Sequence, residues 1–279
     1  MNRPIAVFDS GLGGLSVVRH LRALLPHYDI VYFGDTARVP YGTKSRHTVA
    51  HFALETAGFL LDFEPQLIVA ACNTASALAL DALHDALPVP VIGVVEPGAR
   101  AAVQLADGGP IAVLGTEATI ASGAYPAAIR ALSPHVDVIP VACPLFVPLV
   151  EEGRRADDPL VRLATEDYLA PLRQRDVRVV VLGCTHYPLL RDAIALALSR
   201  GVHLVDSGRE TSRAVRAQLE RAGPLASGGP PGTLRCFVSD NPERFGAVGS
   251  RFLEQPLEHV EYVAPERYVR APSGALEHP

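Results

Sequence analysis

The chain has 279 residues, of which 48% are hydrophobic and 20% charged, and its formal net charge is −5. This length allows two domains that each bury a core, and the composition is typical of a globular protein rather than a disordered one. The acidic balance argues against nucleic-acid binding, which requires clustered lysine and arginine. Lys44 is the only lysine, and its polar surroundings disfavour the Schiff base that a pyridoxal phosphate enzyme needs.

No apolar stretch has the length of a membrane-spanning helix, and the N-terminus leads into a strand pattern without the hydrophobic region of a signal peptide. We therefore expect a cytoplasmic protein that does not bind a membrane. In that reducing compartment the four cysteines should be free thiols. None has the CxxC spacing of a zinc or redox site, so no metal or cofactor is expected.

The chain begins with the pattern of a strand, a glycine loop and a helix. The strand at residues 5–8 leads into Asp9, Ser10 and the loop glycines, and apolar residues then recur at helical spacing. The loop lacks the third glycine of a dinucleotide fingerprint, and no phosphate-loop lysine follows. We interpret the glycines as positions where a small ligand can approach the backbone.

A second strand, a polar loop and an amphipathic helix follow, at residues 29–33, 34–42 and 45–63. The loop carries Tyr41 and Gly42. An apolar strand then ends at Cys72, where Asn73 and Thr74 have the composition of a helix start. We expect the unit to end with a strand at residues 89–94, and the chain to pass to the next domain at residues 96–98.

From residue 110 the pattern begins again, and three landmarks recur in the same order at nearly the same spacing. Residues 110–113 repeat the letters PIAV of residues 4–7, a strand at 136–141 corresponds to that at 29–33, and Cys184 corresponds to Cys72. Such a repeat indicates a duplicated α/β unit. Alternating strands and helices predict parallel sheets that bind ligands outside the carboxyl ends of their strands. We therefore expect both cysteines to face one cleft between two pseudo-symmetric domains.

The late elements have no counterpart in the second unit, so we assign them to the first domain. They are a helix at 209–222, a strand at 234–238, a helix at 241–253 and a short strand at 260–263. The predicted domains are residues 1–96 with 208–270 and residues 97–207, and a loose tail is expected at 271–279.

Cys72 and Cys184 are candidates for acid/base chemistry because of their place in this predicted fold. Each lies at the end of a buried strand and the start of a helix, where the helix dipole and unpaired N–H groups lower a thiol pKa. Thr185 is expected to cap the second of these helices, and His186 lies within reach of Cys184.

A cysteine beside a histidine is typical of a nucleophilic hydrolase, and this alternative stays open. A hydrolase needs one nucleophile, however, whereas this chain places a thiol in each half. Cofactor-independent racemisation needs two acid/base groups on opposite faces of a stereocentre, because one removes the α-proton while the other donates a proton. We therefore favour a racemase and interpret Cys143 and Cys236 as buried structural residues.

Other polar residues are candidates for the cleft. Asp9 ends the first strand and is the expected acceptor for a substrate ammonium. Glu151 lies next to Glu152, and solvation at the surface is the competing interpretation of this pair. Thr116 and Thr119 occupy the place that the glycine loop holds in the first unit, where they either bind a ligand or cap a helix.

Six motifs carry a resemblance to a known family. They are DSGLGGLSV at 9–17, PYGTKS at 40–45, CNTAS at 72–76, GTEAT at 115–119, ACPLFVPLVEEG at 142–153 and GCTHYPLL at 183–190. As a set, and in this order, they closely resemble the motifs of the glutamate racemases of bacterial cell-wall synthesis. Beyond residue 208 the chain resembles that family in layout more than in letters.

The resemblance implies a cofactor-independent isomerase that interconverts L- and D-glutamate and supplies the D form for peptidoglycan, and thus for cell shape. It implies that Cys72 and Cys184 are the two catalytic bases, assisted by Asp9, His186 and Glu151. The implied substrate contacts are Asp9, Ser10, Tyr41, Gly42, Asn73, Thr74, Thr116, Thr119, Thr185 and His186. We expect Asp9 to serve Cys72 and His186 to serve Cys184.

Three alternatives stay open. The same machinery would racemise aspartate or another amino acid, since pocket length rather than the cysteine motifs selects the substrate. A hydrolase or decarboxylase would use only one of the thiols. A binding or regulatory role is the third, because some glutamate racemases inhibit DNA gyrase, although no segment here identifies a gyrase contact. The resemblance also implies a homodimer, whose interface the sequence does not indicate.

Overall fold

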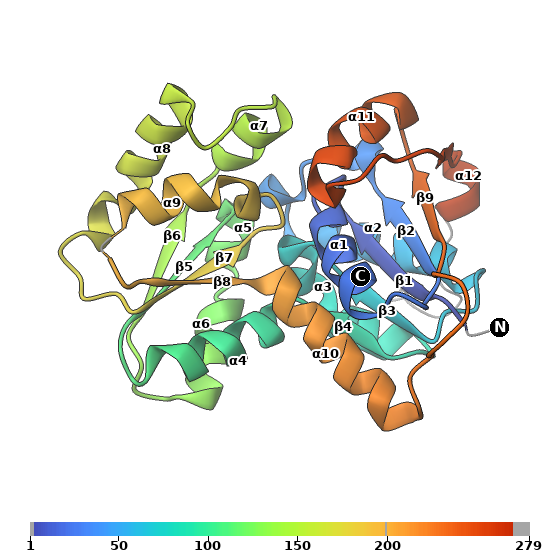
Figure 1. Ribbon diagram of the computed structural model, residues 1–279, viewed down its shortest axis with the longest axis horizontal. Helices are drawn as coiled ribbons and strands as arrows, with labels where there is room; N and C mark the ends of the chain where they lie inside the picture. The colour runs from blue at the N-terminus through green and yellow to red at the C-terminus, as the bar shows by residue number, and fades with distance from the viewer. Residues whose placement is uncertain (1–2, 199, 270–279) are drawn as a thin grey trace.

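Two parallel β-sheets, each flanked by helices, lie side by side in the computed structural model, which describes residues 3–198 and 200–269 (Figure 1). Strands form where the sequence has apolar runs, and every residue of β1, Ile5–Asp9, and of β7, Val179–Gly183, is buried. Helices on both faces of a parallel sheet bury such runs on both sides. The predicted α/β fold class is confirmed.

The first sheet has six parallel strands in the order β10-β9-β2-β1-β3-β4. These strands are β1 at Ile5–Asp9, β2 at Ile30–Gly34, β3 at Leu67–Ala70, β4 at Val91–Gly93, β9 at Leu234–Val238 and β10 at Val260–Tyr262. The late strands β9 and β10 extend the sheet beyond β2, to which β9 is paired. Strand β4 is shorter than the one expected at 89–94, because Pro90 has no N–H to offer a neighbouring strand.

The second sheet has four parallel strands in the order β6-β5-β7-β8, which repeats the order β2-β1-β3-β4 of the first. Its strands are β5 at Ile111–Gly115, β6 at Val138–Ala142, β7 at Val179–Gly183 and β8 at His203–Asp206. The pairs β1 with β3 and β5 with β7 have the same register. Cys72 and Cys184 therefore lie at equivalent positions beyond the ends of β3 and β7, as a duplicated unit predicts.

Helices cover both sheets (Figure 1). Those of the first are α1 at Leu15–Leu24, α2 at Arg46–Leu61, α3 at Asn73–Ala86, α11 at Pro242–Leu253 and α12 at Pro265–Tyr268. Those of the second are α5 at Glu117–Ala121, α6 at Ala124–Leu132, α7 at Phe146–Glu151, α8 at Pro159–Leu169 and α9 at Arg191–Ala197. Among the helices of the described ranges, none combines the length and the apolar character that a membrane span requires. The tail expected at 271–279 lies outside the described residues.

Two helices rather than loops connect the sheets. Helix α4, Val95–Ala106, leads from β4 to β5, and α10, Ser207–Ala222, leads from β8 back toward the first sheet and packs against α1 and α4. The residues expected at the domain crossing, 96–98, lie in the first turn of α4, where the missing N–H of Pro97 is not needed. The domain bounds after residues 96 and 207 stay a prediction.

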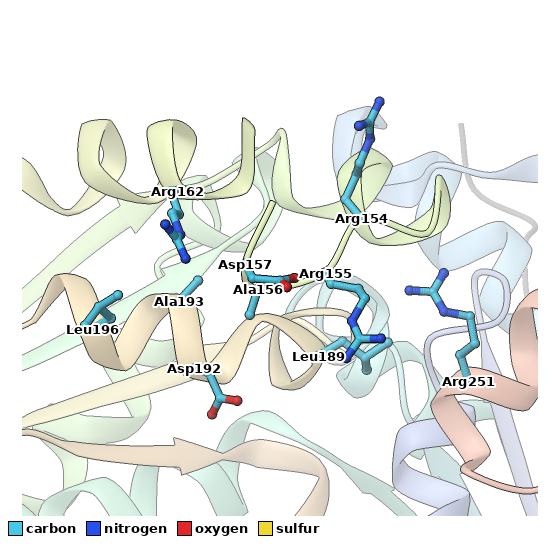
Figure 2. A pocket seen from close by; sticks show the side chains of 10 residues that line it. All are labelled: Arg154, Arg155, Ala156, Asp157, Arg162, Leu189, Asp192, Ala193, Leu196 and Arg251. Atoms are coloured by element: carbon cyan, nitrogen blue, oxygen red, sulfur yellow. The ribbon is translucent and has the colours of Figure 1, made fainter. Parts of the chain in front are cut away.

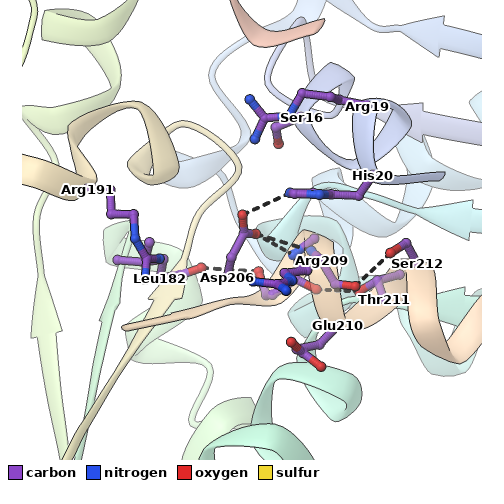
Figure 3. Close-up of polar contacts among 12 residues, drawn as sticks. Ser16, Arg19, His20, Leu182, Arg191, Asp206, Arg209, Glu210, Thr211 and Ser212 are labelled. Carbon is purple, nitrogen blue, oxygen red and sulfur yellow. Dashed lines mark hydrogen bonds and ion pairs between the residues drawn. The ribbon is translucent and has the colours of Figure 1, made fainter. Parts of the chain in front are cut away.

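The start of α10 also restrains the two halves relative to each other (Figure 3). Asp206 Oδ1 accepts hydrogen bonds from the N–H groups of Gly208 and Arg209, which caps α10. Its Oδ2 lies 3.1 Å from Nε2 of His20, which belongs to α1 in the first half. Residues from both halves thus converge on one carboxylate.

Candidate active site

A cavity of about 360 Å³ lies between the two sheets, at the carboxyl ends of their strands. Its lining residues come from both halves: Ser10, Val39, Pro40, Tyr41, Gly42, Thr43, Cys72, Asn73, Thr74, Thr116, Glu117, Pro144, Val147, Pro148, Glu151, Cys184, Thr185 and His186. The volume is that of a site for a small molecule. Both thiols therefore face one cavity, each from a different copy of the duplicated unit.

Every site residue that the sequence predicts lines this cavity, except Asp9 and Thr119. These two are almost fully buried, with 1% of each exposed. Sequence reasoning did not single out seven other lining residues: Val39, Pro40, Thr43, Glu117, Pro144, Val147 and Pro148. Six of them lie within the same motifs as the predicted residues, and Val39 directly precedes one of these motifs, so proximity to a motif was the available signal. The described lining contains carboxylates but neither lysine nor arginine.

A second hollow of about 500 Å³ lies between the loop after α7 and helices α9 and α11 (Figure 2). Its lining includes Arg154, Arg155, Arg162 and Arg251, together with Asp157 and Asp192. It contains none of the predicted site residues and no thiol. The chemistry of the candidate site therefore belongs to the first cavity.

Cys72 is itself the N-cap of α3. Its Sγ accepts a hydrogen bond from the N–H of Ala75 at 3.5 Å, and its thiol donates to Ser10 Oγ at 3.6 Å. Asn73 is the first helical residue rather than the cap, so the predicted start is one residue late. The expected depression of the thiol pKa is wrong: burial, with a smaller contribution from the charge of Asp9, raises the pKa of Cys72 to about 12.

Cys184 lies in a different local structure. A short 3-10 helix at Tyr187–Leu190 follows it, with His186 at the cap position and no side-chain capping bond, before α9 begins. The expected cap at Thr185 is therefore wrong, because a 3-10 helix begins here, one residue later than a cap at Thr185 would place it, whereas an α-helix follows Cys72 directly. The Sγ of Cys184 lies 3.8 Å from His186 Nδ1, which confirms that the two side chains are within reach of each other.

His186 connects Cys184 to a carboxylate. Its Nε2 lies 3.1 Å from Glu151 Oε1, and its side chain is 7% exposed. Burial lowers the pKa of His186, but its hydrogen bonds with Cys184 and Glu151 outweigh burial and raise this pKa to about 10. The hydrogen bond from His186 in turn lowers the pKa of Glu151. The pair is thus poised as an imidazolium beside a carboxylate.

Asp9 lies behind the cavity rather than in its wall. Its Oδ2 accepts a hydrogen bond from the N–H of Gly11 at 2.9 Å, whereas its Oδ1 has no partner among the described residues. Burial raises the pKa of Asp9, and the charge of His186 opposes that rise. Its charge acts both on Cys72 and on His186, and its assignment to the Cys72 side stays a prediction.

Asn73 lines the cavity, and its amide has one unpaired atom. Its Nδ2 donates to Tyr125 Oη at 2.8 Å and to Ser207 Oγ at 3.2 Å, which fixes the amide. Its Oδ1 is buried and has no partner among the described residues. Because a buried carbonyl oxygen without a donor is costly, this atom is suited to accept from a bound ligand.

Three threonine hydroxyls form a closed triangle at the cavity wall. Thr74 Oγ1 lies 3.0 Å from Thr116 Oγ1 and 3.1 Å from Thr119 Oγ1, and the latter two lie 2.9 Å apart. Thr74 belongs to α3 and the others to the start of α5, where Thr116 is the N-cap. The triangle therefore joins the two halves, and Thr119 acts through it although it does not line the cavity.

A network of charged side chains on the side away from the cavity fixes the loop that carries Tyr41. The Tyr41 hydroxyl donates to Asp35 Oδ2 at 2.5 Å, and Arg38 Nε donates to the same oxygen at 2.7 Å. Arg38 also pairs with Glu55 of α2. This network places Tyr41 and Gly42 in the wall, and a Cβ atom at Gly42 would lie only 2.8 Å from Thr116 Cβ.

The glycine loop after β1 does not leave its backbone open to the cavity, contrary to the interpretation from sequence. Gly11, Gly13 and Gly14 are absent from the lining. A Cβ atom at Gly14 would lie 2.7 Å from Asp9 Cβ, and one at Gly13 would collide with Thr185. What these glycines allow to approach the loop is therefore other protein groups and not a ligand.

The arrangement matches that of known proteins. The sequence pattern of the family described as Asp/Glu/Hydantoin racemase matches residues 15–215 of the chain. The chain belongs to this racemase family. A glutamate racemase from Geobacter metallireducens is 48% identical over 264 residues, which are 95% of this chain and 97% of that protein. One from Chlorobium phaeobacteroides is 45% identical over 93% of this chain and 96% of that protein.

Solved structures of the family have the same fold. A glutamate racemase from Francisella tularensis in complex with D-glutamate has a TM-score of 0.88 and 40% identity, over 96% of this chain and 99% of that chain. The glutamate racemase from Thermus thermophilus in complex with beta-chloro-D-alanine has a TM-score of 0.84 and 46% identity, over 95% and 98%. Racemases are isomerases, so the predicted enzyme class is confirmed. Within the described ranges, no three His, Cys, Asp or Glu side chains gather as a metal site would require.

Proposed function

We propose that this protein interconverts L- and D-glutamate without a cofactor, with Cys72 and Cys184 as the two bases. The observation that carries the proposal is the placement of two buried thiols, at equivalent ends of a duplicated unit, on one cavity for a small molecule. The glutamate specificity is supported by relatives that are 43–48% identical and carry that name.

In this mechanism one thiolate removes the α-proton, and the thiol on the opposite face donates a proton to the carbanion. Their roles exchange for the other enantiomer. A thiol with a pKa near 12 is a poor source of thiolate. A substrate ammonium bound beside Cys72 would favour the charged form and lower this pKa.

The cavity lining supplies the remaining groups. We assign the substrate carboxylates to the hydroxyls of Ser10, Thr74, Thr116 and Thr185 and to the N–H groups at the start of α3, where the helix dipole favours an anion. We assign the ammonium to the neighbourhood of Asn73, whose buried Oδ1 has no partner among the described residues. The predicted ammonium acceptor, Asp9, is buried behind the wall, so we assign it the electrostatic support of that charge.

Cys184, His186 and Glu151 also form a chain of nucleophile, base and acid, as in a thiol hydrolase. This second candidate leaves Cys72 without a role. A hydrolase would be trapped covalently at Cys184 and would be indifferent to Cys72→Ala. Racemisation requires both thiols.

Incubation with L-glutamate in deuterium oxide, without added cofactor, tests the proposal. A two-base mechanism places solvent deuterium in the D-glutamate formed, while the L-glutamate left early in the reaction keeps its α-hydrogen. Equal early labelling of both enantiomers would indicate a single base instead. The same assay with aspartate tests the substrate, and faster labelling of aspartate would overturn the glutamate assignment.

We further propose that the enzyme works in the cytoplasm, where D-glutamate is needed for peptidoglycan, and that it is a homodimer. The family resemblance supports both statements. Leu160 and Leu163 on α8 are 51% and 66% exposed, so this helix offers an apolar contact to a second copy. Light scattering coupled to size exclusion measures the mass, and a monomer at micromolar concentration would contradict the dimer.

A further inference from the structure

The corner formed by Cys184, Thr185 and His186 belongs to the second sheet, but the first half of the chain holds it. The glycine loop makes the closest contact. A Cβ atom at Gly13 would lie 2.2 Å from Thr185 Oγ1 and 2.6 Å from His186 Nδ1. Only glycine therefore lets the start of α1 approach the corner this closely.

Ser16, in the first turn of α1, fixes the backbone of the same corner. Its hydroxyl donates to the carbonyl oxygen of Thr185 at 3.2 Å, and the side chain is 1% exposed. The bond joins α1 of the first half directly to the backbone of the second half. Because the acceptor lies directly between Cys184 and His186 in sequence, this bond restrains the path of the chain between them.

Phe252, near the end of α11, restrains the imidazole itself. Its ring centroid lies 5.1 Å from that of His186 with an interplanar angle of 79°, and Phe252 is fully buried. This edge-to-face contact limits rotation of the imidazole about its side-chain bonds. Helices α1 and α11 pack together on the side of the first sheet turned toward the second (Figure 1).

We propose that Ser16 and Phe252 are positioning residues that set the place of Cys184 and the ring angle of His186 relative to Cys72. The proposal rests on the two-thiol function above. Neither residue lines the cavity, so both act through the corner. A misplacement of about 1 Å in a catalytic group can cost about a hundredfold in rate, which makes such distant contacts important.

The test compares Ser16→Ala and Phe252→Leu with matched controls. Ser212→Ala removes another hydroxyl of a buried serine, one that bonds within α10. Phe59→Leu shortens a buried ring in α2 that packs against Phe33 and Phe237, away from the cavity. For each variant, kcat and KM are measured for both enantiomers, together with the melting temperature and the kinetic isotope effect of α-deuterated L- and D-glutamate.

The isotope effects distinguish positioning from general destabilisation. The two enantiomers have equal free energy in solution, so kcat/KM must fall by the same factor in both directions. A displaced Cys184, with Cys72 unmoved, instead changes the two isotope effects unequally. We expect Ser16→Ala to lower kcat about tenfold, with KM nearly unchanged. Phe252→Leu should lower kcat between about tenfold and a hundredfold, and both control variants should keep the wild-type isotope effects.

The outcomes separate this proposal from the function on which it rests. If wild-type protein fails to exchange the α-proton, the function itself is wrong. If it racemises glutamate and needs both thiols, while Ser16→Ala and Phe252→Leu match their controls in kcat and isotope effects, the positioning roles are overturned. Should Phe252→Leu not fold, Ser16→Ala decides alone, since it removes a single oxygen atom.

Discussion

The corners at Cys72 and Cys184 occupy equivalent positions in two copies of one unit, yet their surroundings differ. Cys72 caps a regular helix and contacts the Ser10 hydroxyl. Cys184 precedes a tight 3-10 turn and contacts His186, with Glu151 behind it. Duplication has preserved where the strands end, which places both thiols on one cavity. The residues that contact each thiol come from the segments that follow the strands, and these segments differ between the two copies.

The difference matters because, in the proposed mechanism, the two thiols act on opposite enantiomers, yet different side chains surround them. The Cys184 side has an imidazole whose pKa is raised to about 10 and a carboxylate that supports it. The Cys72 side has a thiol whose pKa burial raises to about 12, and the buried charge of Asp9 adds to that rise. We infer that binding of the substrate's positive charge activates Cys72, while His186 serves Cys184 before substrate arrives.

The largest expected effect tests whether the two corners are equally necessary. Cys72→Ala and Cys184→Ala should each lower racemisation by about a thousandfold or more, because each removes one of two acid/base groups. Polarimetry of glutamate measures the rate, and circular dichroism checks that the fold is retained. If either variant kept wild-type turnover, the two corners would not form one catalytic pair.

The next effect separates the helpers of the two corners. His186→Gln removes the imidazole and should lower kcat about a hundredfold, whereas Ser10→Ala on the Cys72 side should cost about threefold to tenfold. Steady-state kinetics with both enantiomers gives the two values. If the two variants lost kcat by the same factor, the different side chains beside Cys72 and Cys184 would have no effect on catalysis.

A third prediction concerns the stability of the Cys184 side. The pKa of His186 rises from 6.5 to about 10 on folding, so its contribution is complete below pH 6.5 and is lost as pH rises through about 10. The pKa of Glu151 falls from 4.5, so its contribution is present above pH 4.5 and is lost as pH decreases further.

Glu151→Gln should therefore reduce the free energy of unfolding by about 1–2 kcal/mol, most clearly between pH 4.5 and 6.5. Urea unfolding of both proteins across this range measures the difference. Asp158→Asn, at an exposed ion pair of the same region, is the control. A constant difference from pH 4 to pH 10.5 would contradict a charged His186–Glu151 pair.

The smallest effect probes the contact between the halves. Thr116→Val keeps the shape of the side chain but removes its hydroxyl from the cavity wall and from its bonds to Thr74 and Thr119. We expect KM for glutamate to rise about threefold to tenfold, with a smaller change in kcat. A selective fall in kcat would mean that this hydroxyl contacts the transition state rather than the bound substrate.

Most of the scaffold was predictable because it depends on local patterns. Apolar runs marked the strands, and the repeated PIAV letters together with the two cysteines revealed the duplication. Since parallel strands end at one edge of a sheet, the positions of Cys72 and Cys184 on a common cavity followed. The racemase motifs then identified eleven of the eighteen lining residues.

The remaining features depend on competition between distant groups. Burial and the helix dipole act in opposite directions on the pKa of Cys72, and only the folded structure shows that burial is the stronger. The side chain of Asp9 is directed behind the cavity wall. The sequence near a strand end does not reveal whether such a side chain points into a cavity or behind it. The role of Gly13 depends on Thr185, far away in the sequence.

The triangle of Thr74, Thr116 and Thr119 has a consequence for the protons between the two halves of the molecule. Each hydroxyl can donate or accept, so hydrogen bonds can run around the triangle in either direction with the same atoms in the same places. Reversal needs only rotation of three protons. The link between the two halves at the cavity wall therefore has two proton arrangements, and no heavy atom has to move for one to become the other.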